Sequence, residues 1–163
     1  IDWAADQRDA GLSAAELAAW VEENKLKVQH WFFTTDLTTF VRGGRVSKAA
    51  GIFGGLLEIC PLLHVDPKGC LIAMEKVRTK KRVIRETVKK MEQLAANGTA
   101  YNGKCYISQS SCYEDAREVA DLIESTFPNL KGKVEINWIG NLIGSHTGPG
   151  TVALFFCSSE SRK

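Results

Sequence analysis

The sequence predicts an α/β fold in which a mixed β-sheet is covered by helices. Short runs rich in β-branched, aromatic and other apolar residues recur along the chain, as expected of strands. In the second half these runs alternate with segments whose apolar residues follow helical spacing, an order typical of a sheet with helices packed on it. The 163 residues, 44% hydrophobic and 25% charged, suffice for one domain with a buried core.

Helices are expected where a residue that caps helix N-termini precedes apolar residues at helical spacing. Ser13 and Glu16 form a capping box. Thr79 precedes a long amphipathic segment that reaches about Ala96 and is closed by Asn97-Gly98. The expected helices begin after Ser13, Asp36, Ser47 and Thr79, and a last one spans 113–126.

Strands are expected at 27–34, 57–65, 71–74, 105–108, 134–139 and 151–156. Pro61 indicates an edge position or a bend in the second of these, because proline cannot donate to a strand ladder. Residues 66–69 have the composition of a hairpin turn. The glycine-rich segment 140–150 is expected to be a loop, and the last residues, 158–163, a mobile tail.

The composition argues against several classes of protein. The net charge of +2 is too small to indicate a polyanionic partner, and no apolar run approaches the roughly 20 residues of a membrane span. The five cysteines are odd in number and form no Cys-x-x-Cys pair, so we expect free thiols, no metal site and a cytoplasmic location. No signal peptide is recognisable, and Ile1 in place of an initiator methionine suggests a start within a longer protein.

The segment RGGRVSKAAGIFGG, residues 42–55, joins two arginines and a Gly-Gly pair to a run of small and apolar residues. Arg42 and Arg45, together with the amide groups of the turn and a helix capped by Ser47, could cradle an anion. The small residues of that helix would let a long apolar ligand approach its backbone. The candidate contacts for such a ligand are Ile52, Phe53 and Leu56. A solvated surface turn followed by a tightly packed helix is the alternative.

The segment IGSHTGPG, residues 143–150, presents one titratable side chain, His146, between glycines. Near neutral pH an imidazole can donate a hydrogen bond to an anionic oxygen, and its charge can change there. The alternatives are a loop histidine that bonds to backbone, or a general base in a hydrolase or transferase. A nucleophilic pair with Ser145 is disfavoured, because neighbouring side chains point apart in extended backbone and no Gly-x-Ser-x-Gly motif is present.

Three stretches together resemble the carboxy-terminal lobe of the DegV family of fatty-acid-binding proteins. They are TTDLTTFVRGGRVSKAAGIFGGLLEICPLL, MEKVRTKK and IGNLIGSHTGPGTVALFF, which follow the family's order and spacing over most of 34–156. The resemblance implies that 1–163 is the second lobe of a two-lobed α/β protein, and that the first lobe is absent from this sequence. Gln109 departs from the family pattern, which often has histidine there.

The resemblance also implies a function. Family members bury a long-chain fatty acid between two lobes, and characterised members are lipid-binding subunits of bacterial fatty-acid kinase. A separate kinase subunit phosphorylates the carboxylate, and the carrier takes the acyl-phosphate onward, with a membrane acyltransferase as a further candidate partner. No catalytic residue, metal or cofactor is expected in the carrier itself. The residues implied at the head group are Arg42 and His146, with Arg45, Thr147 and Gly148 as neighbours.

Residues 76–90 carry eight basic side chains and one acidic one, the strongest charge feature of the chain. A solvated helix face, a docking surface for a kinase subunit and contact with an anionic membrane surface all fit this pattern. Nucleic-acid binding is disfavoured, because the segment lacks interleaved aromatic residues and no nucleic-acid-binding signature accompanies it.

Overall fold

The computed structural model describes residues 1–44 and 59–163. The helices are α1 (Asp2–Asp9), α2 (Ala14–Asn24), α3 (Thr38–Arg42), α5 (Lys80–Leu94), α6 (Tyr113–Thr126) and α7 (Asn141–Thr147), with 3-10 turns η1 (Lys25–Lys27) and η2 (Gly98–Ala100). The strands are β1 (Val28–Thr34), β2 (Cys60–Val65), β3 (Leu71–Val77), β4 (Tyr106–Ser110), β5 (Glu135–Trp138) and β6 (Thr151–Cys157). The helix expected after Ser47 lies outside the described residues. The same holds for four of the predicted site residues: Arg45, Ile52, Phe53 and Leu56.

The six strands form one sheet in the order β3-β2-β1-β6-β4-β5. All neighbouring pairs are antiparallel except β4 and β5, which are parallel and joined through α6. Parallel neighbours need such a crossover, because a tight turn can only reverse the chain. The predicted α/β class with a mixed sheet is confirmed.

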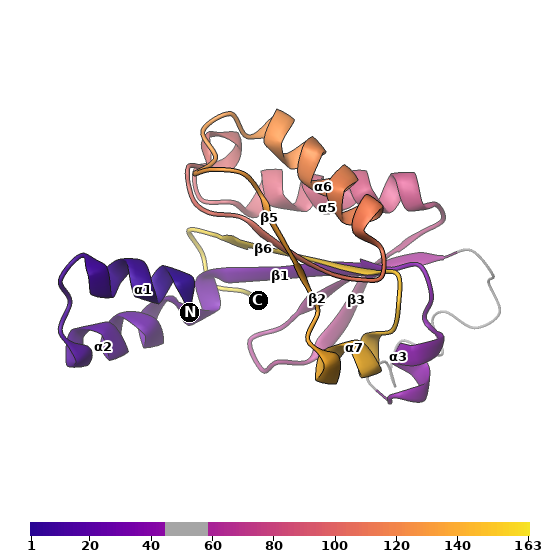
Figure 1. The fold of residues 1–163 in the computed structure, drawn as a ribbon, viewed down its shortest axis with the longest axis horizontal. Coiled ribbons are helices and arrows are strands. Elements are labelled where there is room, and N and C mark those ends of the chain that lie inside the picture. Colours follow the sequence, from indigo (N-terminus) through magenta and orange to yellow (C-terminus); the bar gives the residue numbers. More distant parts are fainter. Residues whose placement is uncertain (45–58) are drawn as a thin grey trace.

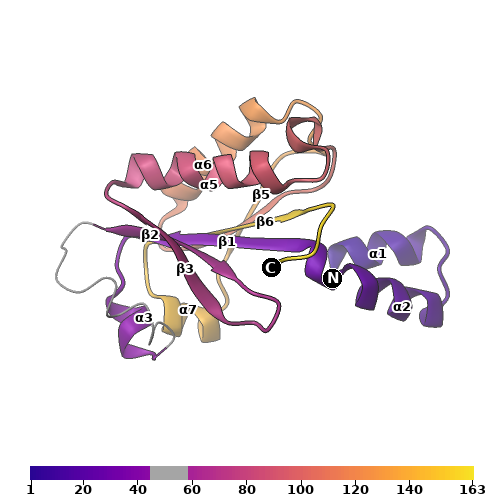
Figure 2. The same cartoon turned by 180° about the vertical axis from the view of Figure 1, so that it is seen from behind.

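Helices α5 and α6 cover one face of the sheet, as both views of the ribbon show (Figures 1 and 2). Strand residues alternate between faces, so every second residue of the central strands meets these helices. The main core therefore combines inward residues of both layers, all at most 5% exposed: Trp31, Phe33, Leu62, Ile107, Leu154 and Phe156 from the sheet, and Val83, Ile84, Val88, Met91, Ala116, Val119, Ala120 and Ile123 from the helices.

The opposite face carries a smaller apolar cluster built on Phe32, Phe40 and Leu63. Helices α3 and α7 contact each other and lie on this side of the sheet, away from α5 and α6 (Figure 1). Because these two helices are short, much of this face has no helix over it among the described residues. This uneven cover leaves room for a cavity.

Two predicted helix starts are confirmed and a third needs correction. The Ser13 hydroxyl accepts from the Glu16 amide in a complete capping box, and the Thr79 hydroxyl accepts from the Arg82 amide. Asp36 does not cap α3, which begins at Thr38 after Leu37. Its Oδ1 instead accepts from the Thr38 amide at 2.8 Å, a local side-chain to backbone bond that competes with helical pairing.

The sequence expectation was wrong for residues 141–147, which form α7 instead of a loop. Gly144 lies in the middle of this short helix, and glycine has poor helix propensity. Such a helix depends on tertiary packing, here on α3, more than on its own sequence.

Helix α1 was not predicted at all. Its Asp2 and Asp6 pair with the Nζ of Lys104, two residues before β4, at 2.5 Å and 2.8 Å.

Pro61 is not on an edge strand, since β2 lies between β1 and β3. It sits outside the part of β2 that pairs with β1, so its missing amide costs no bond there. The register of β2 against β3 shifts between Leu62 and Leu63, which is the irregularity that proline indicated. The hairpin turn is confirmed, because the Asp66 carboxylate accepts from the amides of Lys68 and Cys70.

Residues 158–163 fold back beside the start of β1. The Ser158 amide donates to the Lys27 carbonyl at 2.9 Å, and the Arg162 amide donates to the Leu26 carbonyl at 2.8 Å. These contacts define where the segment packs, and its mobility stays a prediction. Within 1–44 and 59–163, no helix combines the length and apolar character that a membrane crossing requires.

Candidate functional site

An apolar groove of about 670 Å³ lies on the sheet face opposite α5 and α6. Its floor is formed by β1, β6 and β4, one wall by α7 with the segment before it, and the other wall by the β2–β3 hairpin. The residues that define the groove are His30, Phe32, Val65, Gly69, Leu71, Ser108, Trp138, Ile139, Gly140, Leu142, Ile143, His146, Thr147, Thr151, Ala153 and Phe155.

Strand register orders the floor of the groove from one end to the other. Thr34 pairs with Thr151, Phe32 with Ala153, and His30 with Phe155, so these pairs form three successive rungs on one face. The outer rungs are four positions apart along β1, which gives the floor a length of about 13 Å at 3.3 Å per residue. Ala153 is the small residue in the middle of the floor, where a larger side chain would fill the groove.

The α7 side of the groove carries exposed apolar residues. Trp138, Leu142 and Ile143 are 71%, 74% and 56% exposed. Single exposed apolar side chains are ordinary on soluble proteins, but three large ones beside an apolar groove form a contiguous patch. Such a patch is typical of a surface that binds a ligand or another protein segment.

Two glycines let α7 pack against the segment around α3. Gly148 has φ +74°, and a Cβ there would lie 2.5 Å from the Thr39 hydroxyl oxygen. Gly150 has φ +79°, and a Cβ there would collide with the Thr35 hydroxyl. Only glycine accepts both the backbone conformation and the close approach. The motif Gly-Pro-Gly therefore fixes the position of His146 and Thr147.

The structure places the predicted head-group residues around the junction of α3 and α7. His146 and Thr147 line the groove, and Gly148 follows them directly. Arg42 is exposed and does not line the groove. The next residue, Gly43, lies close to His146, because a Cβ added to Gly43 would lie 3.4 Å from His146 Nδ1. The backbone thus brings Gly43, the residue after Arg42, beside His146 across about a hundred positions of sequence. The contact of Arg42 and His146 with a ligand stays a prediction.

Thr147 carries an unusual polar atom at this end. Its Oγ1 is buried and has no hydrogen-bond partner among the described residues. Its carbonyl oxygen, in contrast, accepts from the Thr151 hydroxyl at 3.1 Å. Buried hydroxyls are normally satisfied by protein, water or ligand, so Thr147 Oγ1 fits an oxygen of a bound head group.

The far end of the groove is marked by His30. Burial, then the neighbouring charges of Arg162 and His64, lower the pKa of His30 to about 4, so its ring is neutral near pH 7. Arg162 Nη1 lies 3.0 Å from His30 Nδ1, and the Phe155 ring meets the imidazole edge-on at 5.3 Å between centroids. Sequence reasoning missed His30, because one histidine in an aromatic strand looks like a core residue.

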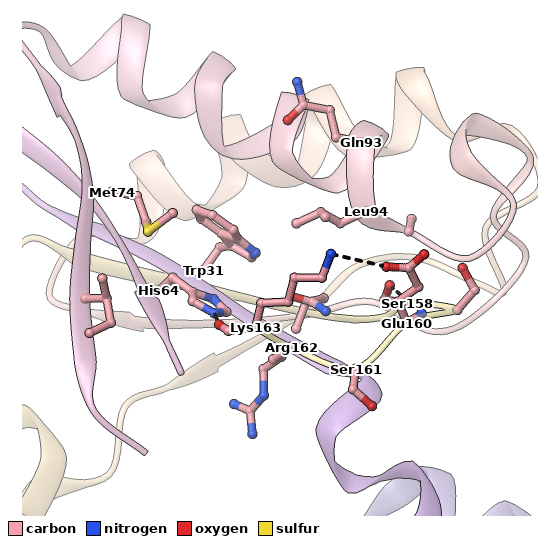
Figure 3. Close-up of a pocket in the computed structure, with 14 residues that line it drawn as sticks. Trp31, His64, Met74, Gln93, Leu94, Ser158, Glu160, Ser161, Arg162 and Lys163 are labelled. Atoms are coloured by element: carbon pink, nitrogen blue, oxygen red, sulfur yellow. Dashed lines mark hydrogen bonds and ion pairs between the residues drawn. The ribbon is translucent and has the colours of Figure 1, made fainter. Parts of the chain in front are cut away.

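A second cavity of about 350 Å³ lies on the other face of the sheet, beside Trp31 and His64 (Figure 3). Leu94 of α5, Met74 of β3 and the segment 158–163 surround it, and Figure 3 shows the Lys163 side chain across its opening. None of the predicted site residues that the structure describes lines this cavity. It is about half the size of the groove and more polar at its rim, so the groove is the better candidate for a long apolar ligand.

Two further positions bear on function. Gln109 is 1% exposed, and its Oε1 accepts from the Cys112 amide at 2.8 Å, so this departure from the family pattern serves the start of α6 and not the groove. The Ser145 hydroxyl donates to the Leu142 carbonyl at 2.8 Å, which places it within α7 and gives no support to a nucleophilic pair. No cluster of three metal-ligating side chains occurs in the described portion of the chain.

The sequence of this chain is similar to those of known proteins. A family model described as uncharacterised protein, DegV family COG1307, matches residues 2–159. A DegV domain-containing protein of Clostridium perfringens is 38% identical over 154 residues, or 94% of this chain and 52% of that protein. This chain therefore spans about half the length of that relative.

Solved structures share the fold. The fatty acid binding DegV family protein of Streptococcus agalactiae is 27% identical with a TM-score of 0.78, and the match covers 96% of this chain and 54% of that one. The Streptococcus pneumoniae fatty acid kinase B3 protein, solved with linoleic acid, is 22% identical with a TM-score of 0.83 over 97% of this chain and 54% of that one. The second likeness concerns the fold alone.

Proposed function

The chain belongs to the DegV family, as its motifs predicted, and on this premise we propose that it binds a long-chain fatty acid in the groove between the sheet and α7. The observation that carries the proposal is the apolar groove itself, about 670 Å³ in volume and bordered at one end by His146. The similar protein of Streptococcus agalactiae is a fatty acid binding protein, which supports the same ligand class.

The groove offers different chemistry to the two ends of such a ligand. The acyl chain would lie over Phe32 and Ala153. Burial at about 0.8 kcal/mol per CH₂ gives a chain of about sixteen carbons a gross stabilisation of about 12 kcal/mol before the entropy of binding is subtracted. The carboxylate would meet His146, Thr147 and Arg42. Apolar burial then supplies the affinity, and the polar end fixes the orientation.

The proposal extends to a carrier role in fatty-acid phosphorylation. The motif resemblance supports a separate kinase subunit that phosphorylates the bound carboxylate while this protein holds the acid. Since the chain spans about half the length of its relatives, we propose that it is the carboxy-terminal lobe and that a second lobe covers the groove. The exposed patch of Trp138, Leu142 and Ile143 fits such a cover.

Filling the groove tests the ligand site. In the full-length protein, Ala153→Phe would place a ring over the middle of the floor, and fatty-acid affinity should fall at least tenfold because the chain can no longer lie there. Ala100→Phe, at an exposed position of η2, is the matched control and should bind like the wild type. Displacement of a fluorescent fatty acid measures both. Equal affinity of the two variants would refute the site.

The head-group assignment has its own test. His146→Ala and Arg42→Ala should impair acyl-phosphate formation more than fatty-acid binding, because each acts on the charged end and not on the buried chain. A lost hydrogen bond to a charged group costs about 1.5–3 kcal/mol, or roughly ten- to a hundred-fold in an equilibrium constant. Acyl-phosphate formation is measured as ATP consumption with the kinase subunit present. Fatty-acid binding is measured as lipid displacement without that subunit. Intact phosphorylation in both variants would contradict the assignment.

A further inference from the structure

The segment that follows the last strand packs beside the start of β1. After β6 the chain turns back, and the backbone bonds from Ser158 to Lys27 and from Arg162 to Leu26 hold it against η1 and the residues that lead into β1. Figure 1 shows the C-terminal end beside the start of β1, on the side of the hairpin that joins β2 and β3. The segment therefore lies near His30, where the floor of the groove ends.

Arg162 is the residue of this segment whose side chain contacts His30. Its Nη1 lies 3.0 Å from His30 Nδ1, and His30 lines the groove. Arg162 and Lys163 both belong to the residues that line the cavity beside Trp31, but Figure 3 shows the guanidinium of Arg162 pointing away from the other residues of that cavity. Asp66, in the turn after β2, is close enough for its charge to act on Arg162. The guanidinium is thus located near both His30 and the hairpin that forms the second wall.

Building on the proposed function, we propose that Arg162, held by His30, is a polar stop at the far end of the groove and determines the longest acyl chain that the protein accepts. A methyl end that advanced past His30 would strip water from a charged guanidinium and offer it no hydrogen bond in return. That exchange is unfavourable, so chains that end before His30 bind and longer chains must bend or leave carbons outside.

The hydrogen bonding of Arg162 supports a role beyond anchoring the segment. Its Nε is buried and has no partner among the described residues, and the nitrogen it contacts belongs to a neutral imidazole. The backbone amide of Arg162 already fixes the segment to Leu26. A buried donor without a partner does not stabilise the fold, so stability alone does not account for this side chain.

The test measures affinity against chain length in the full-length protein. Wild type, Arg162→Ala and the control Lys163→Ala are titrated with saturated acids from lauric to behenic by displacement of a fluorescent fatty acid. Lys163 is adjacent in sequence, but its side chain is 93% exposed and pairs only loosely, at 3.9 Å, with Glu160. It therefore controls for loss of a positive charge from the same segment.

We expect the wild-type affinity to rise with chain length and then to stop rising at one acid. In Arg162→Ala that limit should move to a longer acid, and the first acid beyond the wild-type limit should bind about tenfold more tightly, the gain expected from burying two more CH₂ groups. Lys163→Ala should keep the wild-type limit. Identical limits in wild type and Arg162→Ala, or an equal loss of affinity at every chain length, would overturn the inference. If the wild type binds none of the acids, the proposed function itself is wrong and the inference falls with it.

Discussion

Replacement of Gly148 by alanine should disrupt the packing that positions His146. Gly148 has φ +74° and ψ 176°, a region open almost only to glycine, and strain there costs about 1–3 kcal/mol for other residues. The new Cβ would also lie 2.5 Å from the hydroxyl oxygen and 2.8 Å from the Cβ of Thr39, so α7 and α3 would have to separate. We expect a total loss of about 3 kcal/mol in the free energy of unfolding.

The matched control lies four residues earlier. Gly144 is inside α7, and a Cβ there would meet only Ile139 Cγ2 at 3.9 Å, an ordinary contact. Gly144→Ala should therefore be neutral or stabilise by up to about 1 kcal/mol, because alanine is the better helix former. Each variant adds one methyl group to the same short segment, so their comparison measures the combined effect of the contact with Thr39 and the backbone strain at Gly148.

Thermal unfolding of the full-length protein measures the difference. A loss of about 3 kcal/mol corresponds to a decrease of about 6–12 °C in Tm for a domain of this size. Adding Thr39→Gly to Gly148→Ala removes the overlapping side chain and should recover part of the loss, although the backbone strain remains. If Gly148→Ala melts at the wild-type temperature, the argument that glycine is required at this junction is refuted.

Three further predictions concern stability and reactivity. The pKa of His30 falls from an ordinary 6.5 to about 4 on folding, so the unfolded chain binds more protons than the folded one between these pH values. The free energy of unfolding should therefore decrease by up to about 1 kcal/mol per pH unit as pH falls from 6.5 to 4. Urea titrations at several pH values check this, and His30→Gln should flatten the dependence. Tyr101→Phe should cost about 1–3 kcal/mol in the same assay, because the buried hydroxyl donates to a backbone carbonyl and accepts from the Cys157 amide at 3.1 Å. Maleimide should label exposed Cys70 and spare Cys105, whose burial raises its thiol pKa to about 12. Mass spectrometry of the labelled peptides measures this, and faster labelling of Cys105 than of Cys70 would contradict the burial of Cys105.

The sequence predicted those parts of the fold that depend on local signals. Ser13 and Thr79 cap their helices through the bonds that their residue types suggest, and the alternation of large apolar residues in β1 and β6 matches the two faces of the sheet. In these cases the determining interaction lies within a few residues or follows from strand periodicity. The expected closure of the helix by Asn97-Gly98 is wrong, because α5 ends at Leu94 with Ala95 extended, and Asn97, with φ +66°, precedes η2 instead.

The parts that the sequence did not predict depend on contacts between distant segments. Helix α7 looks like a glycine-rich loop because Gly144 weakens it, and its stabilising partner α3 lies about a hundred positions earlier. His146 was identified from its motif, whereas His30 was missed because no local pattern distinguishes it from a core residue. Its place at the groove end follows from the pairing of β1 with β6, and Arg162, which contacts it, lies 132 positions away.

A crystal structure of the full-length protein grown with palmitic acid would locate the bound ligand. We expect the carboxylate to lie beside His146 and Thr147 and the acyl chain to run over Phe32 and Ala153 towards His30. An acyl chain in the cavity beside Trp31, or a carboxylate at the His30 end of the groove, would contradict it.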